Sequence, residues 1–176
     1  MKYAAVTIEG LSPLLMHRFP MEPIEAMEKK TPEEQARIAL YELDGKPYIP
    51  GVALHRTLIN GAAYSKGKGR ASLQKVVCAA LFVEESILPL NGKTVPWAVD
   101  SRPVVVPATR GRILRHRPRF DQWETNFTLA WDETLMTEQQ VRRIVDDAGQ
   151  RVGILDFRPA TKGPMGRFVV TKWKGR

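Results

Sequence analysis

Residues 123–149 of this 176-residue chain read WETNFTLAWDETLMTEQQVRRIVDDAG. The first nine residues alternate, which is typical of a strand with one buried face; the side chains that share that face are Trp123, Thr125, Phe127, Leu129 and Trp131. Thr137 followed by Gln140 forms a capping box, and the apolar residues after it recur at helical spacing up to Gly149, the expected helix stop. The stretch therefore predicts a core-facing strand followed by an amphipathic helix.

Similar patterns outside this stretch predict the remaining elements. We expect strands at 2–9, 76–83 and 167–173, a helix at 52–63, and a short helix that Thr31 caps with Glu34 in the box position. Residues 76–83 form a continuous apolar run, so they are interpreted as a buried central strand in which Cys78 is a small core residue.

The order of these elements predicts the fold class. Without the insertions it is strand, helix, strand, strand, helix, strand, which is the split βαβ order of an α+β, ferredoxin-like (βαββαβ, RRM-like) domain. We expect one domain over residues 1–176, with an acidic loop and short helix inserted at 10–44. A hairpin insertion at 84–122 separates the second and third strands.

Composition excludes several classes of protein. The chain has 43% hydrophobic residues and a single cysteine, which excludes a disulfide scaffold or a Cys-cluster zinc site and suits a reducing cytoplasm. No apolar run is long enough for a membrane span, and no histidine lies in a metal-binding spacing. We therefore expect a cytoplasmic protein with no membrane association, metal or cofactor.

The net charge of +8 is unevenly distributed. Residues 22–44 hold seven acids, residues 45–83 and 101–120 hold none, and Asp156 is the only acid from residue 151 onward. In an extended strand Arg115, Arg117 and Arg119 would line one face, with Arg110 and Arg112 on the other. Basic blocks of this kind favour a polyanion partner; the aromatic residues beside them that could stack on bases are Trp97, Phe120 and Trp173.

The segment 149–168 holds four of the glycines, interleaved with arginines and a lysine. Glycine lets a backbone approach a phosphate closely, and Arg158 and Arg167 would add forked donors. The segment is neither a Walker A loop nor a dinucleotide fingerprint. From spacing alone it fits equally well a phosphate-contacting loop and a structural connection with tight turns.

Two stretches of this segment, VGILDFR at 152–158 and GPMGRF at 163–168, resemble the C-terminal glycine-rich loop of the RAMP superfamily. The members of this superfamily are the RNA-binding subunits of CRISPR effector complexes. Residues 46–58, KPYIPGVALHRTL, are similar to the entrance to the first helix in their backbone subunits, and Ser12-Pro13-Leu14-Leu15 also suits that group. The resemblance implies that residues 84–122 are a thumb-like hairpin. The family serines after Pro-Gly are here Val52 and Ala53, which leaves backbone N–H groups for phosphate.

The resemblance also raises the question of catalysis. Some RAMP endoribonucleases place a general acid or base where this chain has His17 and His55. No position before the Tyr-Ile-Pro-Gly motif aligns with the aspartate of the backbone subunits that cut target RNA. We therefore predict no catalytic residue, and a metal-independent endoribonuclease using His17 or His55 is kept as an alternative.

The resulting hypothesis is a non-catalytic, largely sequence-independent single-stranded RNA-binding protein, either a CRISPR effector subunit or a minimal homologue from a phage or mobile element. It would assemble as a homo-oligomer along the strand, with other effector subunits as further candidate partners, and the acidic segment 22–44 is a candidate self-assembly face. A phage single-stranded DNA-binding or annealing protein is the second alternative. The expected nucleic-acid contacts are Gly51, His55, Arg56, Lys66, Lys68, Arg70, Arg110, Arg112, Arg115, Arg117, Arg119, Arg158, Lys162, Gly163, Gly166 and Arg167.

Overall fold

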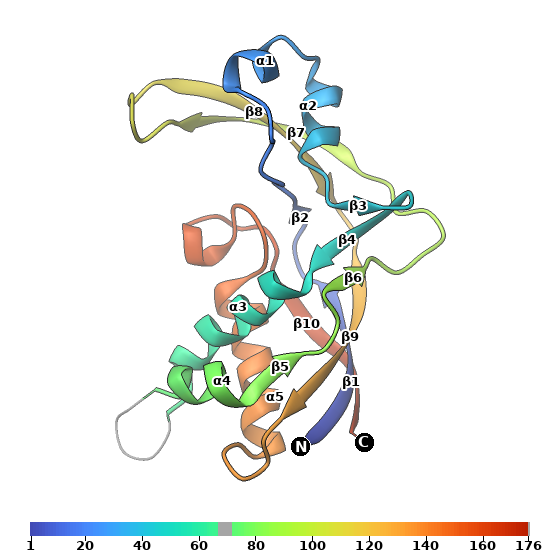
Figure 1. The fold of residues 1–176 in the computed structure, drawn as a ribbon, viewed down its shortest axis with the longest axis vertical. Coiled ribbons are helices and arrows are strands. Elements are labelled where there is room, and N and C mark those ends of the chain that lie inside the picture. The colour runs from blue at the N-terminus through green and yellow to red at the C-terminus, as the bar shows by residue number, and fades with distance from the viewer. Residues whose placement is uncertain (67–71, 176) are drawn as a thin grey trace.

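The computed structural model describes residues 1–66 and 72–175. Its main sheet is antiparallel, with strand order β10-β1-β9-β5. These strands are β1 (Lys2–Gly10), β5 (Leu81–Val83), β9 (Glu124–Trp131) and β10 (Phe168–Gly175). Figure 1 shows an elongated molecule, with this sheet and its helices at one end and a long hairpin at the other.

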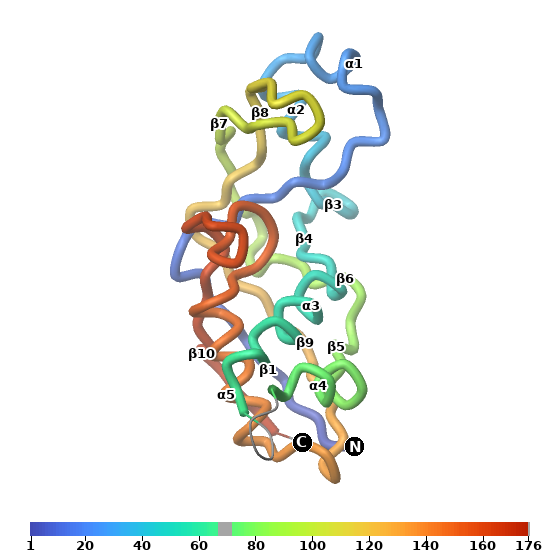
Figure 2. Tube along the Cα trace, turned by 90° about the vertical axis from the view of Figure 1, so that its left-hand side faces the viewer, coloured from blue at the N-terminus to red at the C-terminus, as the bar shows by residue number. Residues whose placement is uncertain are grey.

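Helices α3 (Gly51–Gly61) and α5 (Glu138–Asp147) pack against each other and against the sheet (Figures 1 and 2). The side chains of Ala4, Val6 and Ile8 alternate into the core between the layers. The predicted row from Trp123 to Trp131 is buried there too, which confirms it as core. The chain is thus α+β with several antiparallel sheets, consistent with the predicted ferredoxin-like fold.

The strand prediction at 76–83 is wrong for most of its length. Residues Gln74–Ala80 form helix α4, and only Leu81–Val83 are extended, at an edge of the sheet rather than its centre. Val77 and Ala80 are buried at helical spacing, whereas Cys78 is exposed and is not a core residue. The error arose because a short apolar run without polar residues has no period that separates helix from strand.

Both predicted capping boxes form, Thr31 with Glu34 and Thr137 with Gln140. The helix that Thr137 caps does not stop at Gly149, however. After α5 the chain continues as a π-helical turn, η2 (Ala148–Val152), and this turn ends at Gly153, which has φ of 72°. Gly149 has a packing role instead: a side chain there would collide with Phe168 of β10.

Two smaller sheets build the other end of the molecule. The hairpin β7 (Ala98–Val105) and β8 (Arg112–Phe120) pairs with the short β2 (Leu14–Leu15). The third sheet contains β3 (Glu42–Leu43), β4 (Lys46–Pro50) and β6 (Ile87–Pro89). The insertion at 84–122 thus contains one long hairpin and a strand, β6, that pairs with β4.

Two short helices occupy the acidic segment, α1 (Ile24–Glu28) and α2 (Pro32–Ile38). Helix α2 packs on β8 and β7, and Figure 1 shows both helices beside the hairpin. The acidic segment therefore lies along the basic hairpin of its own chain. The segment 22–44, which the sequence suggested as a self-assembly face, thus makes contacts within its own chain.

Among the described residues, no helix is both long and apolar enough to cross a lipid bilayer.

Candidate nucleic-acid interface

A cavity of about 300 Å³ lies where the start of α3 meets the glycine-rich segment. Its walls come from four separate parts of the chain: the loop after β2, the connection from α2 to β3, helix α3, and the loop after η2. The lining residues are His17, Tyr41, Ala53, Arg56, Thr57, Leu155, Asp156 and Arg158. The cavity thus brings together two of the predicted phosphate-binding arginines, Arg56 and Arg158.

Helix α3 supplies one wall because of the Pro-Gly step at its start. Pro50 is the N-cap residue, and Gly51 allows the loop after β5 to approach so closely that a side chain there would collide with the carbonyl oxygen of Glu85. The Gly51 N–H donates to the Ser86 carbonyl. The first turn holds no acid, so the partial positive charge of the helix N-terminus is not offset there.

The loop opposite is held in an unusual backbone conformation. Five residues between 153 and 166 have positive φ, three of them not glycine: Gly153, Leu155, Phe157, Lys162 and Gly166. Several of its N–H groups donate inside the protein, including Ile154 to the Gly166 carbonyl and Met165 to the Phe157 carbonyl. The internal bonds agree with the interpretation of the loop as a structural connection with tight turns. Arg158 also lines the cavity, and phosphate contact by this loop stays a prediction.

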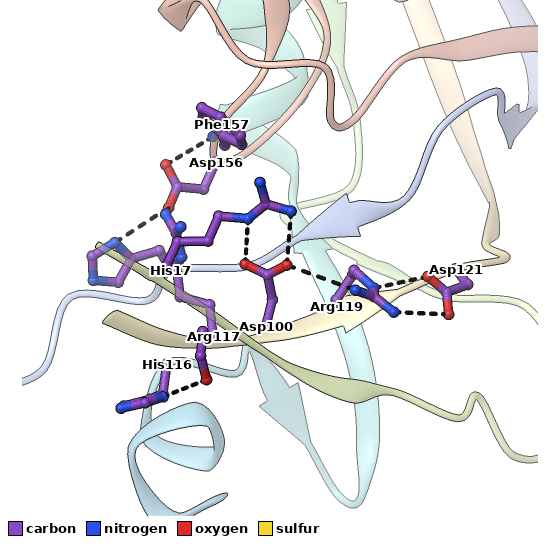
Figure 3. A network of polar contacts seen from close by, with 10 residues as sticks. His17, Asp100, His116, Arg117, Arg119, Asp121, Asp156 and Phe157 are labelled. Atoms are coloured by element: carbon purple, nitrogen blue, oxygen red, sulfur yellow. Dashed lines mark hydrogen bonds and ion pairs between the residues drawn. The ribbon is translucent and has the colours of Figure 1, made fainter. Parts of the chain in front are cut away.

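Asp156 is the centre of a charged network at the base of this cavity (Figure 3). Its carboxylate accepts from the guanidinium of Arg117 and from the backbone N–H of Phe157, and lies 3.4 Å from Nδ1 of His17. Burial by itself raises the pKa of Asp156, but the hydrogen bonds from His17 and Arg117 and the Arg117 charge hold it well below its usual range. Asp156 is therefore a carboxylate at neutral pH.

The same network fastens the hairpin to the glycine-rich loop. Arg117 of β8 is buried and reaches Asp156, while the Arg102 guanidinium of β7 lies 5.1 Å from the centre of the Phe157 ring. Asp100, also buried, pairs with Arg102 and lies 3.7 Å from Arg119, which in turn pairs with Asp121 (Figure 3). Two of the three arginines expected to line one face of the hairpin, Arg117 and Arg119, are thus paired with carboxylates.

The other predicted contacts are dispersed. His55 is directed at the Leu81 carbonyl, 3.0 Å from Nε2, and stacks on Phe82 instead of lining the cavity. Lys66 follows the opposite end of α3, and Lys68 and Arg70 lie outside the described residues. The loop beside the cavity contains Lys162, Gly163, Gly166 and Arg167. On the hairpin, Arg115 lies next to α1, whereas the tip exposes Arg110 and Arg112.

The three suggested stacking aromatics have different environments. Phe120 is fully buried, so this candidate is not available to stack on bases. Trp97 and Trp173 are half-buried, and each has an arginine over its ring, Arg37 at 5.7 Å and Arg142 at 4.7 Å from the ring centre.

The polar cavity residues Tyr41, Thr57 and Asp156 were not among the contacts predicted from the sequence. Tyr41 precedes the turn into β4, and burial, followed by the neighbouring Tyr48, raises its pKa. Asp156 was noticed only as an isolated acid in a basic segment. Its position as a single acid among arginines could have indicated an ion pair, because a carboxylate forms strong hydrogen bonds with a guanidinium group.

Comparison with known proteins supports the fold. No protein-family model and no curated protein matches the chain. A structure search finds the crystal structure of Cmr6 from Pyrococcus furiosus, with a TM-score of 0.51 and 11% identity over 96% of this chain and 99% of that one. A chain of a type IV-B CRISPR complex gives a TM-score of 0.46 and 13% identity, over 97% and 90%. The chain therefore shares an overall fold with Cmr6, which agrees with the α+β fold class that the sequence predicted.

Proposed function

We propose that this protein binds single-stranded RNA along its phosphate backbone, largely independently of sequence and without cutting it, and that copies assemble side by side on the strand. The observation that carries the proposal is the cavity between α3 and the glycine-rich loop. It combines two arginines and an acid-free helix N-terminus at one place, whereas the Thr57 hydroxyl on its wall is buried and donates to the carbonyls of Ala53 and Gly153.

The chemistry of this cavity suits a phosphodiester. Guanidinium groups donate forked, charge-assisted hydrogen bonds to phosphate oxygens, and helix N-terminal N–H groups favour an anion. Asp156, the only carboxylate in the lining, is already neutralised by Arg117, so the charge that remains for a ligand is that of Arg56 and Arg158. The likeness in fold to Cmr6 is compatible with the RNA-binding role that the resemblance of the sequence motifs implies.

Removing the two arginines tests the proposal. The variants Arg56→Ala and Arg158→Ala are each expected to weaken RNA binding by about tenfold, because each removes a charge-assisted hydrogen bond worth about 1.5 kcal/mol or more. The plot of log affinity against log salt should flatten by about 0.7 for each phosphate that is no longer neutralised. Fluorescence anisotropy with a labelled oligonucleotide, repeated over a salt series, measures both quantities.

The matched control is Arg143→Ala, which removes the same charge from an exposed position on α5. It should leave both affinity and salt slope nearly unchanged. A DNA strand of equal sequence serves as competitor, since only contacts to the 2′-hydroxyl separate the two polymers. Equal competition by DNA supports the single-stranded DNA-binding alternative, and equal affinity of all three variants contradicts the proposed site.

A second candidate function, metal-independent RNA cleavage, is favoured by the position of His17. Its Nδ1 faces the Asp156 carboxylate, which orients the ring and leaves Nε2 free to act as a base in the cavity that holds Arg56. Nε2 would take the proton of a 2′-hydroxyl as its oxygen bonds to phosphorus. The P–O5′ bond then breaks and the leaving oxygen takes a proton from water, giving a 2′,3′-cyclic phosphate and a 5′-hydroxyl.

Incubation of end-labelled RNA with wild-type protein and with His17→Ala distinguishes binding from cleavage. Cleavage predicts cyclic-phosphate ends with wild type, a decrease of at least about 100-fold in rate for His17→Ala, and no effect of His55→Ala, because His55 points elsewhere. An RNA that carries a single 2′-deoxy position should resist cutting there. Intact RNA with the wild type excludes this second function.

A further inference from the structure

The cavity between α3 and the glycine-rich loop contains more polar groups than the binding of a phosphate requires. Arg56 and Arg158 supply its positive charge. The other polar side chains in its lining are His17, Tyr41, Thr57 and Asp156. The hydrogen bonds that these four groups already make decide which part of a nucleotide, besides its phosphate, the cavity can recognise.

Two of the four groups are occupied within the protein. The Thr57 hydroxyl is buried and donates to the carbonyls of Ala53 and Gly153. The Asp156 carboxylate accepts from the guanidinium of Arg117, whose charge it balances. The groups that remain for a neutral part of the ligand are therefore His17 and Tyr41.

Tyr41 has a hydroxyl without a partner on a ring that is held in place. Within the described residues this hydroxyl makes no hydrogen bond, although the side chain is half-buried. The ring centre lies 5.8 Å from that of Tyr48, and the Tyr41 carbonyl accepts from the Tyr48 N–H. Burial, followed by Tyr48, raises the pKa of Tyr41, so its hydroxyl keeps its proton at neutral pH and can donate.

His17 offers the complementary group, an acceptor. Its Nδ1 lies 3.4 Å from a carboxylate oxygen of Asp156 (Figure 3). Because a carboxylate can only accept, this contact places the ring proton on Nδ1, and Nε2 of the neutral ring is then an acceptor. The cavity thus combines one donor, one acceptor and two guanidinium groups.

A ribonucleotide matches this combination better than a deoxyribonucleotide. The 2′-hydroxyl is both a donor and an acceptor, and its carbon is bonded to the one that carries the 3′-phosphate. A phosphate between the two arginines therefore brings a 2′-hydroxyl close to it, and this group can pair with both the donor and the acceptor. A deoxyribose leaves both of them without a partner in a site closed to water by the ligand, which costs affinity.

We propose that Tyr41 is the residue with which this protein distinguishes RNA from DNA. Its hydroxyl donates to the 2′-oxygen of the nucleotide whose phosphate Arg56 and Arg158 bind, and Nε2 of His17 accepts from the same 2′-hydroxyl. The inference rests on the proposed function, because it requires a phosphodiester in the cavity. It adds that the preference for RNA comes from one sugar contact in each copy, whereas the phosphate contacts are common to RNA and DNA.

A variant that removes one oxygen atom tests this assignment. Tyr41→Phe keeps the ring and its contact with Tyr48 but lacks the hydroxyl. It should weaken binding to RNA about fivefold, the effect of one neutral hydrogen bond, and change binding to DNA of the same sequence by less than about twofold. The RNA-to-DNA affinity ratio therefore falls about fivefold. Fluorescence anisotropy with labelled strands long enough for one copy measures the ratio.

The matched control is Tyr48→Phe, which removes the same atom from the neighbouring ring outside the cavity lining. It should leave both affinities unchanged. Arg56→Ala and Arg158→Ala should weaken RNA and DNA binding alike and leave the ratio as it is, because they remove phosphate contacts. Thermal unfolding of Tyr41→Phe, expected to match the wild type, shows that the change in ratio does not come from a loss of structure.

The outcomes separate this inference from the proposed function. If Tyr41→Phe keeps the wild-type ratio while the two arginine variants weaken binding, the phosphate site stands and the role of Tyr41 is overturned. A ratio of one for the wild type, or a ratio that falls with His17→Ala but not with Tyr41→Phe, overturns it too. RNA binding that is independent of both arginines contradicts the proposed function itself, and the inference falls with it.

Discussion

Replacing Asp156 with alanine is expected to destabilise the protein by about 3 kcal/mol, because a buried cation is left without its partner. The side chain of Arg117 is only 6% exposed, and among the described residues no other carboxylate lies within ion-pair distance of it. Because Asp156 is 31% exposed, we expect the loss of stability to be at the low end of the range for a broken buried ion pair. For a chain of this size the melting temperature should fall by roughly 6–12 °C. Thermal unfolding followed by circular dichroism measures the change.

The matched control is Asp121→Ala, which removes a carboxylate from the neighbouring pair with Arg119. Both partners there are far more exposed, so the decrease in stability should stay below about 1 kcal/mol. The double variant Asp156→Ala/Arg117→Met should recover part of the stability, because no buried charge is left without a partner. Equal destabilisation by Asp156→Ala and Asp121→Ala would contradict the role given to the buried pair.

The same pair predicts how stability depends on pH. Because the pKa of Asp156 in the folded protein lies well below its usual value, its contribution is fully present above the pKa of an unfolded aspartate, about 3.9. The contribution disappears as the pH falls below that value toward the folded pKa. The stability difference between wild type and Asp156→Asn should therefore be constant near neutral pH and shrink below about pH 4.

Gly166→Ala is expected to be the most disruptive substitution in the glycine-rich loop. Gly166 has φ of 69°, and a side chain there would collide with the carbonyl of Ile154. Its own carbonyl accepts from Ile154 and its N–H donates to the Pro13 carbonyl, so movement away from the collision strains two hydrogen bonds of 2.8 Å. The left-handed conformation alone disfavours alanine by about 1–2 kcal/mol, and the collision should bring the total above about 2 kcal/mol.

Gly45→Ala separates these two contributions. Gly45 has a similar φ of 74°, but nothing lies within 4 Å of the position of a side chain. Its substitution should therefore show the conformational effect alone, about 1 kcal/mol. Urea unfolding of the two variants gives the comparison, and a Gly166→Ala variant no less stable than Gly45→Ala is the result that contradicts the collision.

Sequence patterns predicted the parts of the fold that local chemistry decides. The strand at Glu124–Trp131 and the helices begun by Thr31 and Thr137 formed as expected, because alternation and capping boxes act over a few residues. Helix α4 was missed because its run of small and apolar residues fits either period. The end of α5 was misplaced because Gly149 is required by contact with Phe168, which is distant in sequence.

The sequence predicted individual residues of the candidate site, but not how they come together in space. Arg56 and Arg158 came from separate motifs, and the cavity that joins them depends on how α3 meets the glycine-rich loop. Arg117 looked like a phosphate contact because strand alternation cannot show that Asp156, 39 residues away, takes up its charge. Pairing between distant residues is decided by tertiary packing, which a local pattern does not encode.

The two outer strands of the main sheet also bear on how copies of this protein meet. An outer strand carries unpaired backbone groups that can recruit a strand from another molecule and lead to aggregation. Here β10 exposes Lys172 and Lys174, whose charge opposes such recruitment, and β5 is only three residues long, with its Leu81 carbonyl taken up by His55. The sheet is thus guarded against edge-to-edge growth on both sides.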